Sequence, residues 1–437
     1  MTTLHQRLTL FYVLLLFPSL TATGQDVSSL TFSREAAIES AVRNNPELSV
    51  AALEIERAKL RLRWAGRFEN PELELSSSTD QFGLNEDEGS IEIAFSQRFP
   101  VTSRLRDEKI VRKHDVELAE IEFQVRQRQL AYEVDKAALT LLATERKALL
   151  QSQLIELNKG IVTFMANRVE LGEMSPLDVT QASLNGQLLD QELGTARAAI
   201  TDARSRLQKL LGTDPDQTVS ISDSLVLSPE APSSSIDLNA VLQNRPDYAS
   251  LLAFGDLSRA QLSLATAQRW DDISVKLFAS RELAQDAPEG LERNTFAGIG
   301  LSIPLPLRNR NEQAIEEAKI DIEKARRARG AKMFEIHSEL RAALSAREAA
   351  HLLALSASGE ALELAKKSFN DFKAAQQTGQ ASLLQVQQAQ TQLLQLESSA
   401  LEFQTNYHIT ETEVRFIAGT YPLPQLSAYT NDNFNKK

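Results

Sequence analysis

The chain has 437 residues and contains no cysteine. It therefore cannot form a disulfide framework, a thiolate nucleophile, a zinc–thiolate site or an iron–sulfur cluster, and we expect no lipidated cysteine. Aromatic residues are also scarce, at 6%, and 47 Lys and Arg stand against 59 Asp and Glu. Nucleic-acid binding depends on neutralising phosphates with basic side chains, so the formal net charge of -12 argues against that class.

Long apolar runs are confined to the N-terminal region. Arg7 precedes the run LTLFYVLLLFPSL at residues 8–20, and the small residues Thr21 to Gly24 follow it. This order is typical of a secretory signal peptide. It predicts that the chain is exported and that cleavage near Gly24 removes residues 1–24. No later segment stays apolar long enough for a spanning helix, so any membrane contact is expected through strands or through the surface.

The rest of the sequence contains two copies of one unit, offset by about 200 residues. Six short motifs of the first copy return in the second in the same order. We expect a first repeat at 25–213, a linker at 214–235, a second repeat at 236–420 and a C-terminal tail at 421–437. The matching motifs are Asn45-Pro46 with Arg245-Pro246, Arg63-Trp64 with Arg269-Trp270, Phe99-Pro100 with Leu305-Pro306, Gly172 with Gly379, Gln181-Ala182 with Gln388-Ala389, and Leu211-Gly212 with Ala418-Gly419.

The placement of proline indicates very long helices. Proline is frequent elsewhere but missing from 101–175, 177–214 and 307–421, which are rich in Ala, Leu, Glu, Gln, Lys and Arg. Seventy helical residues reach roughly 100 Å, more than a globular core needs. Glycine can close the turn between a long helix and a shorter one, which predicts two antiparallel coiled-coil hairpins. The expected helices span about 101–170, 175–211, 308–377 and 382–417.

Four segments that precede the long helices alternate polar and apolar residues, a pattern typical of strands with one apolar face. They predict one β-hairpin in each repeat and four strands in all. The expected strands span about 71–78, 89–98, 272–282 and 295–304. The apolar residues of this pattern are Leu73, Leu75, Ile91, Ile93, Phe95, Ile273, Val275, Leu277, Ile299, Leu301 and Ile303.

Four strands are too few to close a barrel, since about eight is the smallest number that fills its own interior. Their apolar face must be buried under helices of the same chain or completed by further copies. Because the helices are expected to form coiled coils, we favour three copies that build a twelve-stranded membrane barrel. Glu72, Glu74, Glu92 and Lys276 would face its lumen. Trp64 and Trp270 would lie at the membrane interface, with ordinary packing between helix and strand as the alternative.

Several segments resemble the TolC-like family of outer-membrane efflux proteins, and the resemblance covers nearly all of the chain after the signal peptide. Residues 30–36, 45–48 and 172–178 look like the whole family. Residues 303–311, with Ala267-Gln268-Arg269-Trp270 before them, look like its heavy-metal branch of the CzcC type. The resemblance implies a trimer in the outer membrane of a Gram-negative bacterium, with a β-barrel continued by a periplasmic α-helical barrel.

The resemblance also implies partners and site residues. The trimer would dock on a periplasmic adaptor and an inner-membrane pump, of the proton-driven resistance-nodulation-division type. The family's drug-exporting type member carries carboxylates where this chain has Gln385 and Gln388. This departure argues against a ring of carboxylates at the periplasmic constriction of the channel. The implied adaptor-docking tip comprises Gly172, Glu173, Met174, Ser175, Gly379, Gln380, Ala381 and Ser382. The implied periplasmic constriction comprises Asp178, Gln181, Gln385 and Gln388.

Enzymatic motifs are missing from the sequence. It has no HExxH, no GxSxG elbow and no Walker-type glycine loop, so we expect no enzyme, no cofactor and no metal site, and an energy source in a partner. We expect His114, His337, His351 and His408 to face solvent on helices. The function indicated is an exit duct, with heavy-metal cations as the expected cargo. The same duct could serve drug or other organic export or type I secretion, and a periplasmic coiled-coil adaptor or scaffold is the alternative from another class.

Overall fold

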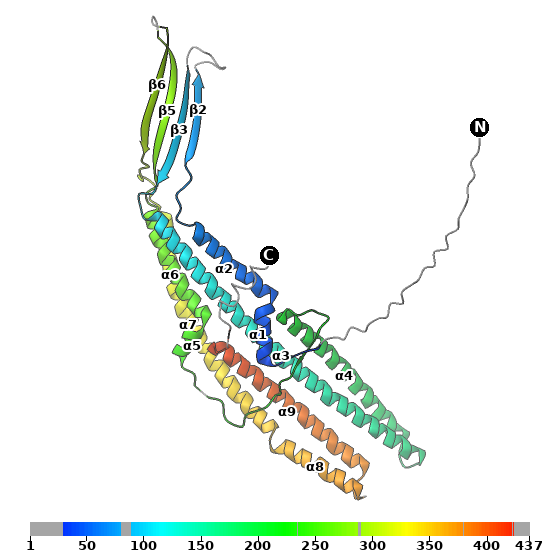
Figure 1. Cartoon of the computed structure of the whole chain (residues 1–437). Helices are drawn as coiled ribbons and strands as arrows, with labels where there is room; N and C mark the ends of the chain where they lie inside the picture. Colours follow the sequence, from blue (N-terminus) through cyan, green and yellow to red (C-terminus); the bar gives the residue numbers. More distant parts are fainter. Residues whose placement is uncertain are drawn as a thin grey trace, which may run out of the picture.

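We analysed a computed structural model of the chain. It describes residues 29–79, 89–233, 235–286, 290–378, 380–421 and 423. The predicted signal peptide, Gly379 and most of the predicted C-terminal tail lie outside the described residues. The molecule is elongated, with a four-stranded sheet at one end and helices that run from it to two turns at the other end (Figure 1).

The elements follow each other in two similar series. The first series consists of β1 (Ser29–Phe32), α1 (Arg34–Asn44), α2 (Pro46–Trp64), β2 (Glu72–Thr79), β3 (Gly89–Phe99), α3 (Arg104–Glu170) and α4 (Pro176–Leu211). The second consists of β4 (Thr218–Ile221), α5 (Leu238–Asn244), α6 (Pro246–Ala267), β5 (Ile273–Asp286), β6 (Gly290–Ser302), α7 (Glu312–Ala357), α8 (Glu360–Gln377) and α9 (Leu383–Ala418). The expected mainly helical class with two repeats and a small β part is confirmed.

Three features differ from the sequence-based expectation. The helix expected over 308–377 is interrupted at Ser358 and Gly359, so it forms α7 and α8. Four further helices, α1, α2, α5 and α6, precede the hairpins of the sheet. The described residues form six strands and not four, because β1 and β4 pair in parallel as a separate two-stranded sheet.

The 67-residue helix α3 is the spine of the molecule. It packs against α1 and α2 along its first half, against α4 along its second half, and against α6 and α9 from the other repeat. The main apolar core lies where α1, α3 and α4 meet, and its fully buried members include Val134, Leu141, Leu207 and Leu211. Among the described residues, no helix is both long and apolar enough to cross a membrane.

The larger sheet has the antiparallel strand order β2-β3-β5-β6 and is open, with β2 and β6 at its edges. Directly opposed residues lie on the same face of a sheet. Leu73 opposes Phe95, Phe95 opposes Leu277, and Leu277 opposes Ile299, so one face is apolar across all four strands. The helices of the chain do not cover this face, because Leu73 is 66% and Ile299 is 76% exposed.

The two repeats also end in the same way, with a glycine that terminates the last helix. Gly212 and Gly419 end α4 and α9 in the left-handed conformation, at φ of 65° and 70°. A Cβ at Gly212 would lie 2.5 Å from the carbonyl oxygen of Asn44, and one at Gly419 would lie 2.8 Å from that of Asn244. In both repeats, therefore, the last helix ends against the asparagine that directly precedes the Asn-Pro or Arg-Pro motif.

Replacing Gly212 or Gly419 with alanine should destabilise the protein. A non-glycine residue at positive φ costs about 1–3 kcal/mol, and here the added Cβ also meets a backbone oxygen. The expected result is a lower midpoint in chemical unfolding of the purified protein in detergent. Gly194→Ala is the control, because Gly194 lies within α4 and a Cβ there meets no heavy atom within 4 Å; an equal loss in that variant would contradict the explanation.

Candidate functional site

The first predicted tip segment is the turn between α3 and α4, at the end of the helical part farthest from the sheet (Figure 1). Gly172 has a φ of 74°, which allows the chain to reverse. Glu173 forms an ion pair with Arg168 of the last turn of α3. Ser175 caps α4, since its hydroxyl accepts a hydrogen bond from the Leu177 amide at 3.2 Å.

The second predicted tip segment is the turn before α9, of which Gly379 lies outside the described residues. Ser382 and Gln385 form a capping box. The Ser382 hydroxyl accepts from the Gln385 amide at 3.3 Å, and the Gln385 side-chain oxygen accepts from the Ser382 amide at 2.9 Å. Gln380 and Ser382 are exposed, and Ala381 is half-buried.

The capping box changes the interpretation of the predicted constriction. All four residues are exposed, but the side-chain oxygen of Gln385 is engaged by the backbone of its own helix. The adjacent Gln387 is the glutamine that packs inside, at 5% exposure. An amide at position 385 thus has a structural role in starting α9, and a gate formed by these four residues stays a prediction.

Replacing Ser382 with alanine should loosen the first turn of α9. Loss of a serine N-cap costs about 0.5–2 kcal/mol, and here the reciprocal bond from Gln385 loses its geometry as well. We expect faster amide hydrogen exchange in peptides that cover 383–389. Gln388→Ala leaves the cap intact and serves as the control. Unchanged exchange in the Ser382 variant would show that the cap does not hold this turn.

The predicted lumen residues lie on the polar face of the sheet, opposite the apolar face. Lys276 on β5 lies 2.7 Å from a carboxylate oxygen of Glu92 and 3.2 Å from one of Glu74. Glu72 pairs instead with Arg98, at 3.4 Å. The structure therefore brings three of the four residues together across β2, β3 and β5. Glu74 is exposed, at 64%, whereas Lys276 and Glu92 are half-buried, at 35% and 28%, so water screens these pairs in part and their contribution to stability is modest.

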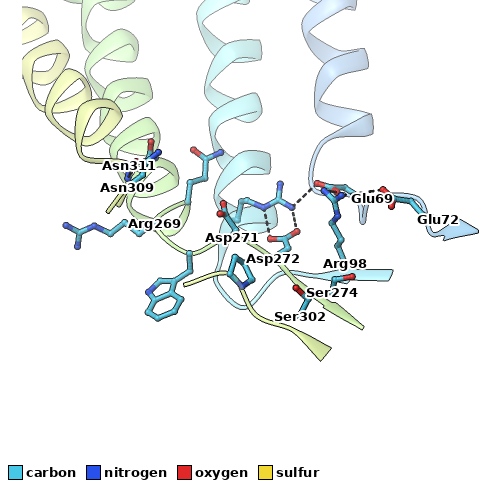
Figure 2. Close-up of a pocket in the computed structure, with 14 residues that line it drawn as sticks. Glu69, Glu72, Arg98, Arg269, Asp271, Asp272, Ser274, Ser302, Asn309 and Asn311 are labelled. Carbon is cyan, nitrogen blue, oxygen red and sulfur yellow. Dashed lines mark hydrogen bonds and ion pairs between the residues drawn. The ribbon is translucent and has the colours of Figure 1, made fainter. Parts of the chain in front are cut away.

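A cavity of about 790 Å³ lies where the helices meet the sheet. Figure 2 shows Glu69, Arg98 and Asp272 grouped between the helix ends and the strand ends that lie nearest the helices. Arg104, at the start of α3, makes two hydrogen bonds to Asp272, at 2.5 and 3.2 Å, and lies 3.7 Å from Glu69. Because Asp272 precedes β5 and Glu69 precedes β2, this network ties both β-hairpins to the spine helix.

The two matched tryptophans lie at the same junction. Trp64 ends α2 and is 61% exposed, with the guanidinium carbon of Arg67 3.8 Å from its ring centroid. Trp270 precedes β5, lines the cavity and is 47% exposed. The alternative of ordinary packing required both rings to be buried between helix and strand, and neither ring is. Their place at a membrane interface stays a prediction.

Two buried charge clusters escaped the sequence analysis. Asp135 on α3 binds Arg34, Thr412 and Tyr421, and Asp247 on α6 binds two arginines and a lysine. The sequence did contain a signal for such clusters, namely a charged residue where the helical pattern places apolar residues on the buried face. Asp135, which lies between Val134 and Ala138, is an example.

The expectation that the histidines face solvent is wrong for His351. It is 2% exposed, and its Nε2 lies 2.9 Å from the carbonyl oxygen of Ser228 in the linker. His408 is half-buried, and burial lowers its pKa below the ordinary value. Within the described ranges, no group of three or more His, Cys, Asp or Glu residues is placed to hold a metal ion.

Comparison with known proteins explains this architecture. Residues 37–213 and 238–420 each match the family described as Outer membrane efflux protein. The chain belongs to this family. The predicted resemblance is thereby confirmed, and the protein is an outer-membrane efflux channel and not an enzyme. Channels of the outer membrane efflux family are trimers that work with a periplasmic adaptor and an inner-membrane pump.

Several relatives of this efflux family are similar over most of their length. The cobalt-zinc-cadmium resistance protein CzcC of Cupriavidus metallidurans is 24% identical over 361 residues, which are 83% of this chain and 84% of CzcC. A crystal structure of CusC superposes with a TM-score of 0.68 and 17% identity, covering 88% of this chain and 92% of CusC. The Campylobacter jejuni outer membrane channel CmeC has a TM-score of 0.68 and 16% identity, over 88% and 85% of the two chains.

Proposed function

We propose that three copies of the chain form a closed duct through which heavy-metal cations leave the cell. The observation that carries this proposal is the four-stranded sheet with one uncovered apolar face, one polar face and two open edges. In lipid every backbone group must be paired, and joining β2 of one copy to β6 of the next would pair both edges. The apolar face would then meet lipid, and Glu72, Glu74, Glu92 and Lys276 would line the lumen.

Exposed apolar residues on the helices support association of the same three copies. Val50 and Leu53 on α2 are 62% and 50% exposed, and Ile320 and Phe334 on α7 are 65% and 75% exposed. The single chain leaves these side chains in water. Isolated exposed apolar residues are ordinary, but several of them on α2 and α7 fit contact with neighbouring helices.

The cargo proposal depends on the relative CzcC, whose name records cobalt, zinc and cadmium resistance. Acidic residues outnumber basic ones among the four predicted lumen residues, which suits the passage of cations. Selection of the cargo is assigned to the pump and adaptor. We propose a proton-driven pump of the resistance-nodulation-division type and docking of the adaptor on Gly172 to Ser175 and Gly379 to Ser382. Removal of residues 1–24 and the absence of a lipid anchor belong to the same proposal.

The experiment is growth of a deletion strain across divalent and monovalent metal ions, beside detergents, dyes and antibiotics. A plasmid-borne copy of the gene is the control. Selective sensitivity to metal ions that the plasmid reverses is the expected result. Sensitivity to organic compounds alone would contradict the metal cargo and favour drug-type export. The mass of the purified protein in detergent tests the assembly separately, and a monomer would contradict the trimeric duct.

A further inference from the structure

Four exposed aromatic side chains lie where the apolar face of the sheet ends beside the helices. Phe99 ends β3 and lies on the same face as Phe95, because alternate residues of a strand share a face. Its ring meets that of Phe68 edge-on, with the ring centroids 6.2 Å apart. Trp64 ends α2 and Trp270 precedes β5, and the four side chains are between 41% and 61% exposed. Aromatic rings at the edge of an apolar surface are typical of a membrane–water interface.

Five exposed arginines accompany these rings, and none of the five forms an ion pair within the described ranges. Two of them, one in each repeat, directly precede the tryptophans. The guanidinium carbon of a third, Arg67, lies 3.8 Å from the ring centroid of Trp64. The last two lie between β6 and α7. These side chains, which we call the arginine belt, are Arg63, Arg67, Arg269, Arg308 and Arg310.

The acidic residues of this junction are mostly engaged by other arginines. Arg98 and Arg104 neutralise three of the four acidic side chains that line the cavity. The fourth, Asp271, lacks an ion pair among the described residues, as does Glu312 at the start of α7. Two unpaired carboxylates against five unpaired guanidinium groups leave the junction with an excess of positive charge.

The arginine belt is separate from the acidic lining of the cavity. Asn309 and Asn311 line the cavity, whereas Arg308 and Arg310 do not. Figure 2 shows Arg269 pointing away from the ion-pair network inside the cavity. The belt is therefore available to a partner outside the chain.

Favourable contact with helix ends does not explain the whole belt. Arg63 lies in the last turn of α2, where a cation suits the negative end of the helix dipole. Arg308 and Arg310, however, precede the N-terminus of α7, where a positive charge is unfavourable. The arginine followed by a tryptophan also recurs at the matching place of both repeats. A negatively charged partner accounts for all of these positions.

We propose that the arginine belt binds the phosphate groups of anionic phospholipids, with the aromatic rings set beside the acyl chains. This rests on the membrane barrel of the proposed function, in which the belt surrounds the barrel at the leaflet nearest the helices. Guanidinium groups bind phosphate oxygens through two parallel hydrogen bonds, and aromatic rings prefer the depth of the headgroups. Each arginine near an anionic lipid surface is worth about five-fold in affinity. Zwitterionic lipids bind less well, because an ammonium group balances their phosphate.

Tryptophan fluorescence tests the lipid preference, because the two tryptophans of the sequence both lie beside the belt. The purified protein is reconstituted into vesicles that contain increasing fractions of a quenching lipid, either phosphatidylglycerol or phosphatidylcholine with brominated acyl chains. We expect brominated phosphatidylglycerol to quench at a lower fraction than brominated phosphatidylcholine. The preference should shrink in about 1 M salt, where the Debye length falls to about 3 Å.

Glutamine variants test the role of the arginines. Arg269→Gln combined with Arg308→Gln should reduce the preference for phosphatidylglycerol about five-fold or more. The matched control combines Arg329→Gln with Arg341→Gln, because these arginines of α7 are also exposed and form no ion pair with a described residue. They lie about 25 Å or more along α7 from its first residue, beyond the belt.

The possible failures of this experiment differ from one another. Equal quenching of the wild-type protein by the two lipids would overturn the proposal and favour an acidic protein surface as the partner of the arginines. An equal loss of preference in the control variant would overturn it as well, because net charge alone would then explain the preference. Quenching by neither lipid would contradict the membrane barrel itself, so a failure of the proposed function has its own signature.

Discussion

Replacing Asp135 with alanine should lower the free energy of unfolding by about 3–5 kcal/mol, because it leaves a largely buried guanidinium without its partner. The Asp135 side chain is 2% exposed and the Arg34 side chain 20% exposed. One carboxylate oxygen accepts from Arg34 at 2.7 Å, and the other accepts from Thr412 at 3.2 Å and from Tyr421 at 3.1 Å. The measurement is the midpoint and slope of chemical unfolding in detergent.

The size of this effect follows from how many segments the carboxylate joins. Arg34 begins α1, Asp135 lies in the middle of α3, Thr412 lies in α9, and Tyr421 follows the end of α9. Burial, together with the neighbouring charge of Asp135, raises the pKa of Tyr421 well above its ordinary value, so its hydroxyl remains a donor. Loss of Asp135 therefore removes the acceptor that holds the start of α1 and the residues after α9 on the spine.

Asp202→Ala is the control for this variant. Asp202 pairs with Arg206 one turn away on α4, and both side chains are exposed, at 65% and 74%. Exposed pairs of this kind contribute about 0.3–0.5 kcal/mol. Asp135→Asn is a second test, because it keeps the shape of the side chain and one acceptor and should fall between the control and Asp135→Ala. A loss below about 1 kcal/mol for Asp135→Ala would contradict the buried network.

The sequence alone predicted the long helices because their signal is local and extends over many turns. The proline-free stretches anticipated α3, α4 and α9 to within a few residues. It also predicted the division of the sheet into an apolar and a polar face, since strict alternation determines which side chains share a face. The same signals could not give the interruption at Gly359, because a single glycine within a helical pattern is compatible with a continuous helix.

Other features of the fold were not predicted, in some cases because they depend on contacts between residues far apart in the sequence. The strand pair of β1 and β4 joins four residues to four others across 189 positions, which leaves no local pattern. The helix α2 did have a signal, since Asn45 caps it and Pro46 occupies its first turn, but that motif served only to align the repeats. The capping role of Gln385 was likewise readable from Ser382 three residues earlier.

Replacing Asp247 should give the second large loss of stability, because three cationic side chains contact its carboxylate. Arg245 binds it at 2.6 and 3.0 Å, Arg128 at 3.1 Å and Lys332 at 3.4 Å. The side chains of Arg245 and Arg128 are 4% and 5% exposed. Arg245 also binds Glu339 at 3.2 Å, and Arg128 donates to the carbonyl oxygen of Phe416 at 2.8 Å. The cluster thereby joins α3, α6, α7 and the last turn of α9.

Replacing Asp247 with alanine should cost about 3–5 kcal/mol, since two nearly buried guanidinium groups lose their shared partner. The duplication supplies a matched control. Glu47 occupies the same place in the first turn of α2, but its side chain is 82% exposed and lies 3.9 Å from Lys209. Both variants remove an acid that favours a helix N-terminus, so the difference between Asp247→Ala and Glu47→Ala isolates the buried cluster. Equal losses in the two variants would contradict its importance.

The difference between wild type and Asp247→Ala should also depend on pH. Burial opposes ionisation of Asp247, but the hydrogen bond from Arg245 and the charges of Arg245 and Arg128 outweigh it and hold the pKa of that carboxyl well below its ordinary value. A depressed pKa stabilises the folded state fully above the unfolded value of about 3.9, and this stability is lost as the pH falls towards the folded pKa. The difference between the unfolding midpoints of the two proteins should therefore be full at neutral pH and should begin to shrink as the pH falls below about 4. A difference that stays constant from neutral to acid pH would show that the aspartate acts through packing and not through its charge.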